Sequence, residues 1–331
     1  MTPMTFAGFG LYAPKEQRPS SALDPIFGQA EGWTAQQFGI ASRGVAGPDE
    51  TTSMMGAEAA RRALAMAGWQ ASDLDVLIGA CGVMEQPIPG TSVLIQEALG
   101  LGKSGIWAFD VNQTCLSFVT ALDVVAMGFE SGRFRRALIV SSDIASAGLD
   151  WANPPSAAIF GDGAAAVCIE AGTGTAGPGL LARGFETYGD GKDLATLRSG
   201  GTRVRIADGF EALAEGARFH MDPFGIFKAA ARSLPVLIDR VLGEAGLNRE
   251  TVDLIVPHQA SAPGLEHLRR LMGGDPARVV DIFNTHGNQI AASVPTTLVE
   301  AHAAERLGPG KTVLLLGTAA GISAAAMVVR T

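Results

Sequence analysis

Three residue types that could do chemistry stand where predicted strands or turns end in this 331-residue chain: Cys115, His258 and Asn288. Cys115 lies between a β-branched, aromatic segment at residues 106–111 and a long apolar run at residues 116–129, which predicts a thiol at a strand-to-helix turn. A helix N-terminus has unpaired backbone N–H groups and a partial positive charge, and both favour a thiolate. We therefore expect Cys115 to be a nucleophile with a lowered pKa.

The other two cysteines have a simpler interpretation. Cys81 and Cys168 lie in or beside apolar runs at residues 76–80 and 164–167, and free cysteines commonly pack as small buried hydrophobic residues. Three cysteines without metal-ligand spacing predict neither a disulfide framework nor a metal site. They favour a reducing compartment, so we expect the protein to be cytoplasmic.

His258 and Asn288 are the candidate partners of the thiol. His258 directly follows an apolar strand-like run at residues 252–256, and Asn288 follows Gly287 in a predicted turn. Function in such sheet proteins gathers where strands end, so both side chains can converge on Cys115. Each also has a structural interpretation, because a histidine after a strand is commonly a hydrogen-bonding residue and an asparagine after glycine commonly forms a turn.

Composition and charge narrow the class of protein. Hydrophobic residues make up 47% of the sequence and there are 42 glycines, enough for a sizeable core with many tight turns. A net charge of −8 disfavours nonspecific binding of nucleic acid. The longest uncharged run, residues 313–329, contains two glycines and fits two short strands better than a membrane span, and the N-terminus lacks a signal-peptide pattern. We expect no nucleic-acid partner and no membrane association.

The order of the predicted elements repeats along the chain. A helix, an aspartate and an apolar strand follow one another at residues 57–78 and again at 228–256, and strand-like runs at 136–141 and 164–169 are matched by runs at 311–316 and 324–329. This alternation predicts a mostly parallel sheet covered by helices, with the helix at 116–127 buried between layers. We therefore expect an α/β protein of two similar halves, residues 1–172 and 173–331, in five layers, with the glycine-rich stretch 172–201 forming loops.

Four motifs in this order resemble those of the β-ketoacyl-acyl-carrier-protein synthase III group of the thiolase superfamily, along nearly the whole chain. They are DVNQTC at residues 110–115, FGDGAAA at 160–166, VPHQA at 256–260, and HGN at 286–288 followed by AASVP at 291–295. The resemblance implies a duplicated thiolase-like αβαβα fold, a homodimer and a Cys-His-Asn site formed by Cys115, His258 and Asn288.

The resemblance also implies a reaction. Cys115 would take an acyl group from a thioester, and a malonyl-type thioester would then lose carbon dioxide and attack that acyl group to give a β-ketoacyl product. His258 and Asn288 would hold the enolate oxygen, and the backbone N–H groups of Cys115 and Ala320 would form the oxyanion hole. No metal or redox cofactor is expected, since thioesters of coenzyme A or phosphopantetheine are the substrates. The setting is fatty-acid initiation or a specialised pathway, and we favour the second.

Three further residues are expected to contact substrate: Trp33, Ile88 and Phe227. Trp33 matches a tryptophan that stacks on the adenine of coenzyme A in the family, although the arginine expected one helical turn later is Gln37. Ile88 occupies the position of a residue that reaches across the dimer to shape the acyl pocket. Such an aliphatic residue, in place of an aromatic one, favours an unusual acyl group.

Recognition of an acyl carrier protein is less well supported by the sequence. Ser261 and Pro263 stand where carrier-binding members have an asparagine and an arginine. Arg269 and Arg270, further along the same predicted helix, are the candidate replacements, because an acidic protein needs a local basic patch to bind an acidic partner. Coenzyme A and carrier-protein thioesters both stay open as donors.

Two other functions stay open beside the condensing enzyme. A non-condensing acyltransferase would pass the acyl group from Cys115 to an alcohol or amine, and it would need His258 as a base but ask little of Asn288. A non-catalytic dimer partner would keep only the fold. The intact Cys, His and Asn argue against the latter.

Overall fold

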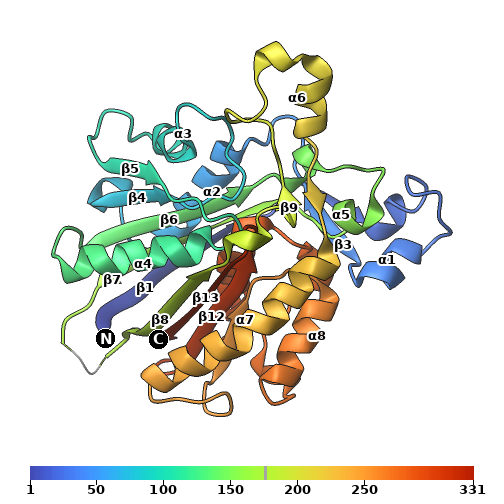
Figure 1. The fold of residues 1–331 in the computed structure, drawn as a ribbon. Coiled ribbons are helices and arrows are strands. Elements are labelled where there is room, and N and C mark those ends of the chain that lie inside the picture. The colour runs from blue at the N-terminus through green and yellow to red at the C-terminus, as the bar shows by residue number, and fades with distance from the viewer. Residues whose placement is uncertain (175–176) are drawn as a thin grey trace.

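A nine-stranded mixed sheet runs through the protein, and the computed structural model describes residues 1–174 and 177–331 (Figure 1). In sheet order the strands are β11 (Leu254–Pro257), β12 (Thr312–Ala319), β13 (Ser323–Arg330), β8 (Gly179–Thr187), β1 (Thr2–Tyr12), β7 (Gly163–Ala171), β6 (Arg136–Asp143), β4 (Val76–Gly79) and β5 (Trp107–Asp110). Two small ribbons pair β2 (Glu16–Pro19) with β3 (Ser42–Val45) and β9 (Ala195–Thr196) with β10 (His220–Met221).

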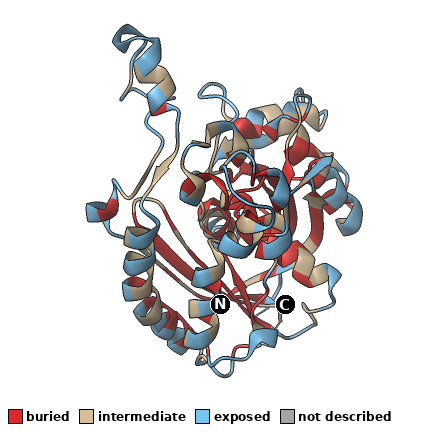
Figure 2. Ribbon diagram, turned by 90° about the vertical axis from the view of Figure 1, so that its right-hand side faces the viewer, coloured by how far each residue is buried: buried red, intermediate tan, exposed pale blue. Residues whose placement is uncertain are grey.

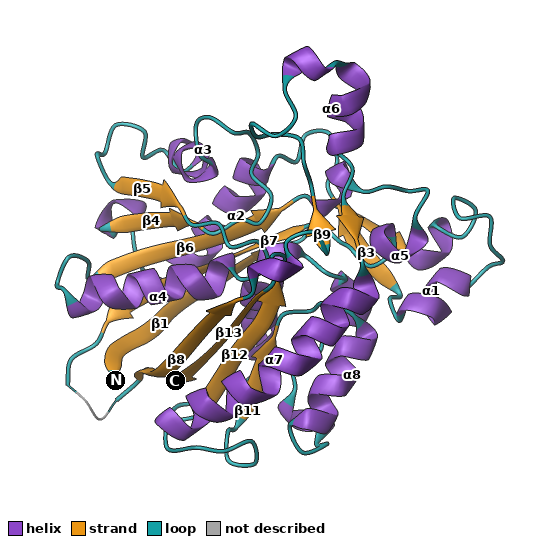
Figure 3. Ribbon diagram, in the orientation of Figure 1, coloured by secondary structure: helices purple, strands orange, loops and turns teal. Residues whose placement is uncertain are grey.

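Helices cover the sheet on its outer faces and fill the space between its two halves (Figure 3). They are α1 (Trp33–Phe38), α2 (Thr52–Ala67), α3 (Thr91–Ala98), α4 (Ser117–Glu130), α5 (Pro154–Ala157), α6 (Phe210–Gly216), α7 (Pro223–Glu244), α8 (Ala262–Leu271), α9 (Phe283–His286) and α10 (Ser293–Ala303). None of the described helices is long and apolar enough to cross a membrane.

The two halves of the sheet have the same strand order and the same pattern of directions. In the first half β4 is parallel to both β5 and β6, and β6, β7 and β1 follow in antiparallel pairs. In the second half β11 is parallel to β12 and forms a parallel bridge between Ile255 and Val279, and β12, β13 and β8 follow in antiparallel pairs. The expected α/β architecture of two similar halves is confirmed. The halves join where β1 pairs with β8 at Thr2–Leu180 and Pro3–Gly179.

Two details of the expected sheet were wrong. The sheet is not mostly parallel, because the parallel pairs are confined to β4 with its two neighbours and to β11 with β12. The tight turn at residues 320–322 joins β12 to β13, and so short a connection permits only antiparallel strands. The stretch 172–201 is also more than loops, since β8 lies inside it and pairs with β13 along its whole length. The division of the chain after residue 172 stays a prediction, and that point lies in the connection between β7 and β8.

The middle layer of the fold is made by α4 and α10. In α4 the side chains of Phe118, Val119, Leu122 and Val125 have no exposed surface, and they pack in one cluster with residues of both halves of the sheet. Burying each of these side chains stabilises the fold by about 1.5–3 kcal/mol. The helices α2 and α3 cover the outer face of the first half, and α7 and α8 cover the second, which completes five layers.

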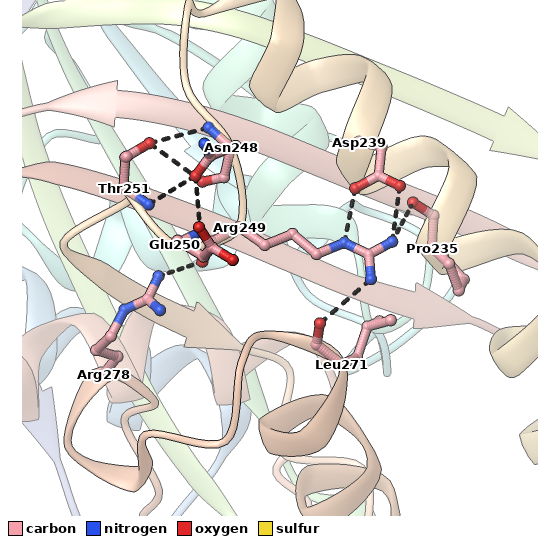
Figure 4. A network of polar contacts seen from close by, with 8 residues as sticks. All are labelled: Pro235, Asp239, Asn248, Arg249, Glu250, Thr251, Leu271 and Arg278. Carbon is pink, nitrogen blue, oxygen red and sulfur yellow. Dashed lines mark hydrogen bonds and ion pairs between the residues drawn. The ribbon is translucent and has the colours of Figure 1, made fainter.

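Polar contacts fix the outer pair α7 and α8 to each other at one end (Figure 4). Arg249 binds both carboxylate oxygens of Asp239 on α7, through Nε at 2.6 Å and Nη2 at 2.7 Å, and its Nη1 donates to the carbonyl of Leu271 on α8 at 3.2 Å. A two-pronged arginine–carboxylate pair fixes orientation as well as distance. The two helices therefore present stable walls to the space beside them.

An arm formed by β9, β10 and α6 stands away from the body of the molecule (Figure 2). Its tip is exposed, including the apolar side chains of Ile206 (88% exposed) and Phe210 (83% exposed). The base of the arm returns to the body, where Phe219 donates its backbone N–H to the carbonyl of Gly148 at 2.8 Å. Thus the tip of the arm is exposed, whereas its base and the segment 197–203 line the interior cavity.

Candidate active site

Cys115, His258 and Asn288 line one cavity of about 1280 Å³. The first half of the sequence contributes residues 82–87, 144–145 and 148–149 to its wall, and the second half contributes parts of α7, α8 and the segment 316–320. The three predicted site residues thus line the same cavity, to which both halves contribute. Of the residues that the structure describes, no group of three or more His, Cys, Asp and Glu side chains is placed to hold a metal ion.

Cys115 lies in a tight turn between β5 and α4, two residues before the helix begins. Thr114 has a left-handed backbone with φ 47°, which a β-branched residue rarely adopts. Two hydrogen bonds hold that conformation: the N–H of Thr114 donates to Asn112 Oδ1 at 2.9 Å, and the N–H of Gln113 donates to Ser117 Oγ at 2.9 Å. The expected thiol at a strand-to-helix turn is confirmed.

The resting state of the thiol differs from our expectation. Burial, with a smaller contribution from the nearby carboxylate of Asp143, raises the pKa of Cys115 to about 12 and outweighs a backbone N–H that favours the thiolate. Cys115 precedes the first turn of α4 rather than occupying it, and the desolvation of a charge costs more than the helix terminus returns. The prediction of a lowered pKa was wrong, and Cys115 carries its proton at neutral pH.

His258 directly follows β11 and is almost fully buried, with 6% of its surface exposed. Its backbone N–H donates to the carbonyl of Leu316 at 2.8 Å. A Cβ placed on Gly317 would lie 2.7 Å from His258 Cβ and 3.3 Å from Leu116 Cδ2, so the histidine and the residue after Cys115 both pack against one glycine. Burial lowers the pKa of His258 to about 4, and its ring is therefore neutral at neutral pH.

Asn288 is held by the first half of the protein. Its backbone N–H donates to the carbonyl of Ile159 at 2.8 Å and its carbonyl accepts from the N–H of Gly161 at 3.1 Å, which explains the FGDG motif. The preceding Gly287 has φ 66°, a conformation suited to glycine. The side chain accepts from the N–H of Ile290 at 2.9 Å and donates from Nδ2 to the carbonyl of Ala260 at 3.4 Å. One N–H of the amide stays available to a ligand.

The turns that carry Cys115 and Asn288 are built alike. Residues 112–117 read Asn-Gln-Thr-Cys-Leu-Ser and residues 288–293 read Asn-Gln-Ile-Ala-Ala-Ser. Ile290 repeats the left-handed backbone of Thr114 with φ 52°, its N–H bonds to the asparagine side chain at the same 2.9 Å, and Gln289 N–H donates to Ser293 Oγ at 2.9 Å. This shared pattern was visible in the sequence but was not recognised there. It places Ala291 in the second turn where the first turn has Cys115.

Two of the remaining predicted residues line the cavity and two do not. Ala320 and Phe227 line the cavity, and the ring of Phe227 lies 5.4 Å from that of His267 on α8. Trp33 is not among the lining residues, and its ring packs edge-on against Phe27 and Phe38. Ile88 also lies outside the lining and is 87% exposed.

Several apolar wall residues were missed by sequence reasoning. They come from separate segments, and no local pattern marks them: Leu149, Ile159, Phe160, Leu197, Phe219 and Met221. The candidate basic patch is already paired, since Arg269 bonds to Asp281 and Arg270 Nε lies 3.0 Å from Glu266 Oε1. Neither arginine lines the cavity.

Comparison with known proteins identifies the family. The family model for the 3-oxoacyl-[acyl-carrier-protein (ACP)] synthase III matches residues 109–189, and the model for its C-terminal part matches residues 242–331. The β-ketoacyl-[acyl-carrier-protein] synthase III of Rhizobium rhizogenes is 31% identical over 98% of both chains, and that of Roseiflexus sp. is 33% identical over 98% of this chain and 97% of the relative. The chain belongs to the 3-oxoacyl-[acyl-carrier-protein] synthase III family.

Solved structures agree with this assignment to the synthase III family. The 3-oxoacyl-[acyl-carrier-protein] synthase III of Aquifex aeolicus is similar with a TM-score of 0.88 and 27% identity, over 99% of this chain and all of that one (100%). The priming β-ketosynthase of the R1128 polyketide pathway is similar with a TM-score of 0.89 and 27% identity, over 99% and 96% of the two chains. OleA of Xanthomonas campestris shares the fold with a TM-score of 0.84 at 22% identity. The duplicated thiolase-like fold is thereby confirmed.

Proposed function

We propose that the protein is a condensing enzyme that loads an acyl group onto Cys115 and joins it to a malonyl-type thioester with loss of carbon dioxide. The observation that carries the proposal is the meeting of Cys115, His258 and Asn288 on one cavity in a chain of the synthase III family. No resident cofactor takes part, because the thioester substrates supply the reactive groups. The product is a β-ketoacyl thioester, made in fatty-acid initiation or in a specialised pathway.

In the first half-reaction the thiol attacks the thioester carbonyl. Since Cys115 is protonated at rest, its proton must leave, and the neutral imidazole of His258 takes that proton and passes it to the departing thiolate of the donor. The oxyanion of the tetrahedral intermediate accepts hydrogen bonds from the backbone N–H groups of Cys115 and Ala320. One such donor is typically worth about 10²–10³-fold in rate.

In the second half-reaction the malonyl carboxylate leaves as carbon dioxide and its bonding electrons form an enolate. The Nε2–H of neutral His258 and the free amide N–H of Asn288 donate to the enolate oxygen. The enolate carbon attacks the acyl carbon, the carbon–sulfur bond to Cys115 breaks with its electron pair on sulfur, and the thiolate takes a proton from solvent. A histidine with a pKa near 4 suits this step, because it remains a neutral donor at neutral pH.

The test separates the two half-reactions. Incubation with acyl-coenzyme A alone should add one acyl mass to the wild-type chain and none to Cys115→Ala, and addition of a malonyl thioester should then release carbon dioxide in equal amount. Asn288→Ala should form the acyl-enzyme normally and condense at least about 100-fold more slowly. An acyl-enzyme that never couples to malonate would show a non-condensing acyltransferase instead, and an Asn288→Ala variant that condenses as fast as wild type would contradict the role of Asn288 in condensation. No adduct at all would indicate a non-catalytic partner.

The assembly and the donor follow from surface features. Ile88 is 87% exposed and outside the cavity of its own chain, which supports a homodimer in which it reaches the cavity of the partner. The edge strand β5 supports the same arrangement, because Trp107 on it is 46% exposed. A monomer in sedimentation equilibrium would contradict this assembly.

Since Arg269 and Arg270 are paired with acidic residues of this chain, coenzyme A thioesters are favoured over the acidic carrier as acyl donors. A cytoplasmic location fits the three free cysteines.

A further inference from the structure

Asp143, at the end of β6, is a carboxylate with no exposed surface that the reaction above does not use. Its Oδ1 accepts from the backbone N–H groups of Gly82 at 2.8 Å and Val83 at 2.6 Å, and its Oδ2 accepts from the N–H of Ala292 at 3.1 Å. Among the ion pairs of the described residues, none involves Asp143. A buried carboxylate without a cation depends on such N–H donors, and hydrogen bonds to a charged acceptor are strong.

The donors belong to two segments, one from each half of the protein, that both lie beside the active site. Gly82 and Val83 begin the loop 82–87 of the first half, which lines the cavity. Ala292 ends the 3₁₀ turn Ile290–Ala292 of the second half, which begins two residues after Asn288. One carboxylate therefore ties a wall of the cavity to the turn that carries Asn288.

The same place holds both left-handed residues of the site. A Cβ placed on Gly82 would lie 2.4 Å from Ile290 Cγ2, 3.3 Å from the carbonyl oxygen of Thr114 and 3.4 Å from Asp143 Oδ1. Thr114 and Ile290 thus both lie close to the position that a side chain on residue 82 would occupy. Backbones of this kind persist only where the surroundings hold them, and Asp143 bonds to the residues on either side of the contact.

Comparison of the 112–117 and 288–293 turns shows that Asp143 takes, in the second turn, the place that the reaction's oxyanion takes in the first. In the second turn Ala291 and Ala292 stand where the first has Cys115 and Leu116, and the backbone N–H of Cys115 is the donor proposed for the reaction's oxyanion. Asp143 supplies an anion to the N–H of Ala292, and the N–H of Ala291 also stabilises its charge. The second turn is therefore an anion cradle that the protein fills with its own carboxylate.

We propose that Asp143 is a positioning residue, an internal hydrogen-bond acceptor that locks the 288–293 turn against the 82–83 loop and thereby fixes Asn288 relative to Cys115. The proposal rests on the proposed function, since its effect is on the half-reaction that uses Asn288. It makes the second turn a support rather than a second reactive site.

Asp143→Asn tests the lock with almost no change of shape. The amide oxygen can keep the two bonds to Gly82 and Val83, but its NH₂ group then faces the N–H of Ala292, so two donors oppose each other. We expect acylation of Cys115 within about threefold of wild type and condensation slower by about 30-fold or more. Hydrogen–deuterium exchange should rise in peptides covering residues 288–293 and stay unchanged at residues 82–84.

Asp253→Asn is the matched control. Asp253 also holds a strand end, through the N–H of Thr312 at 2.8 Å and its hydroxyl at 2.7 Å, and neither residue lines the cavity. It should leave the ratio of the two half-reactions unchanged. If Asp143→Asn does not fold, Ile290→Gly tests the same contact by removing the side chain that lies beside Gly82, and it should again slow condensation more than acylation.

Two results would overturn the lock: equal slowing of both half-reactions, or wild-type exchange at residues 288–293, in the variant that folds. Failure of the proposed function has a different signature. The wild-type enzyme itself would then release no carbon dioxide, whereas the exchange measurement would still report whether Asp143 holds the turn.

Discussion

At the scale of single residues, the site combines groups that are all neutral at rest. Burial keeps the proton on Cys115, keeps the ring of His258 uncharged, and leaves the amide of Asn288 as a neutral donor. Three neutral groups at the reaction centre accept an apolar acyl chain at low desolvation cost. Charge then develops only during the reaction, where the fixed N–H groups are ready to receive it.

The protonated thiol predicts how Cys115 reacts with an alkylating reagent. Because its pKa is about 12, the labelling rate with a small neutral reagent should rise about tenfold for each pH unit above neutrality, without a plateau near pH 8. Cys81 and Cys168 are buried and should stay unlabelled in the folded protein. Peptide mass spectrometry after timed labelling measures all three. A rate that is already constant at neutral pH would show that the thiolate is the resting form.

Gly317 predicts a second residue-scale effect. Gly317→Ala would place a methyl group 2.7 Å from His258 Cβ, so the histidine must shift, and condensation should fall by about 10–100-fold in a folded protein. Gly243→Ala is the control, since a Cβ at that position in α7 meets nothing within 4 Å. It should keep full activity and gain up to about 1 kcal/mol of stability. Carbon dioxide release and thermal melts of both variants decide the matter, and an active Gly317→Ala would refute the contact.

How far the site could be predicted follows from which signals are local. The turn at Cys115 and the positions of His258 and Asn288 could be predicted from the sequence, because each follows a strand or turn with a strong sequence pattern. The pKa of the thiol was not, because it depends on desolvation by segments far away in the chain and on Asp143. Asp143 itself looks like any acidic residue at a strand end. Its three N–H donors come from residues 60, 61 and 149 positions away.

At the scale of secondary structure, the strands of the core were predictable where apolar residues run together, as in β4, β6, β7 and β11. β8 was missed because Gly179 and Gly184 interrupt its pattern. Packing requires at least one of them, since a Cβ on Gly184 would lie 2.7 Å from Val241 Cγ2 of α7. Strand direction also could not be predicted from the local sequence pattern, because it depends on the length and path of the connection between neighbouring strands.

At the scale of the whole molecule, stability should depend on pH through the buried histidine. The pKa of His258 falls from 6.5 to about 4 on folding, so the unfolded chain binds the proton more readily between these values. The stabilising contribution of the neutral ring is complete above pH 6.5 and is lost as the pH falls toward 4. His258→Gln should therefore lose less free energy of unfolding over that range, by at most about 3 kcal/mol.

Urea melts of wild type and His258→Gln across this range measure the difference. Asp143 acts with the opposite sign, because its pKa is raised to about 7 and its protonation favours the folded state between 3.8 and 7. That contribution is present in both proteins and cancels in the comparison. Parallel pH profiles for the two proteins would mean that His258 is not desolvated as the structure indicates.

The repeated Asn-Gln-x-x-x-Ser turn has a consequence for how this architecture came to hold a single reaction centre. The two similar halves contain two equivalent turns, and each turn has a kinked backbone that can receive negative charge. The turn that carries Cys115 binds substrate. The turn that carries Ala291 is occupied by the Asp143 side chain and supports the first turn. A single reaction centre in a protein of two similar halves thus requires that one of the two turns is permanently occupied. A cysteine introduced at position 291 would stay unreactive while Asp143 occupies that turn.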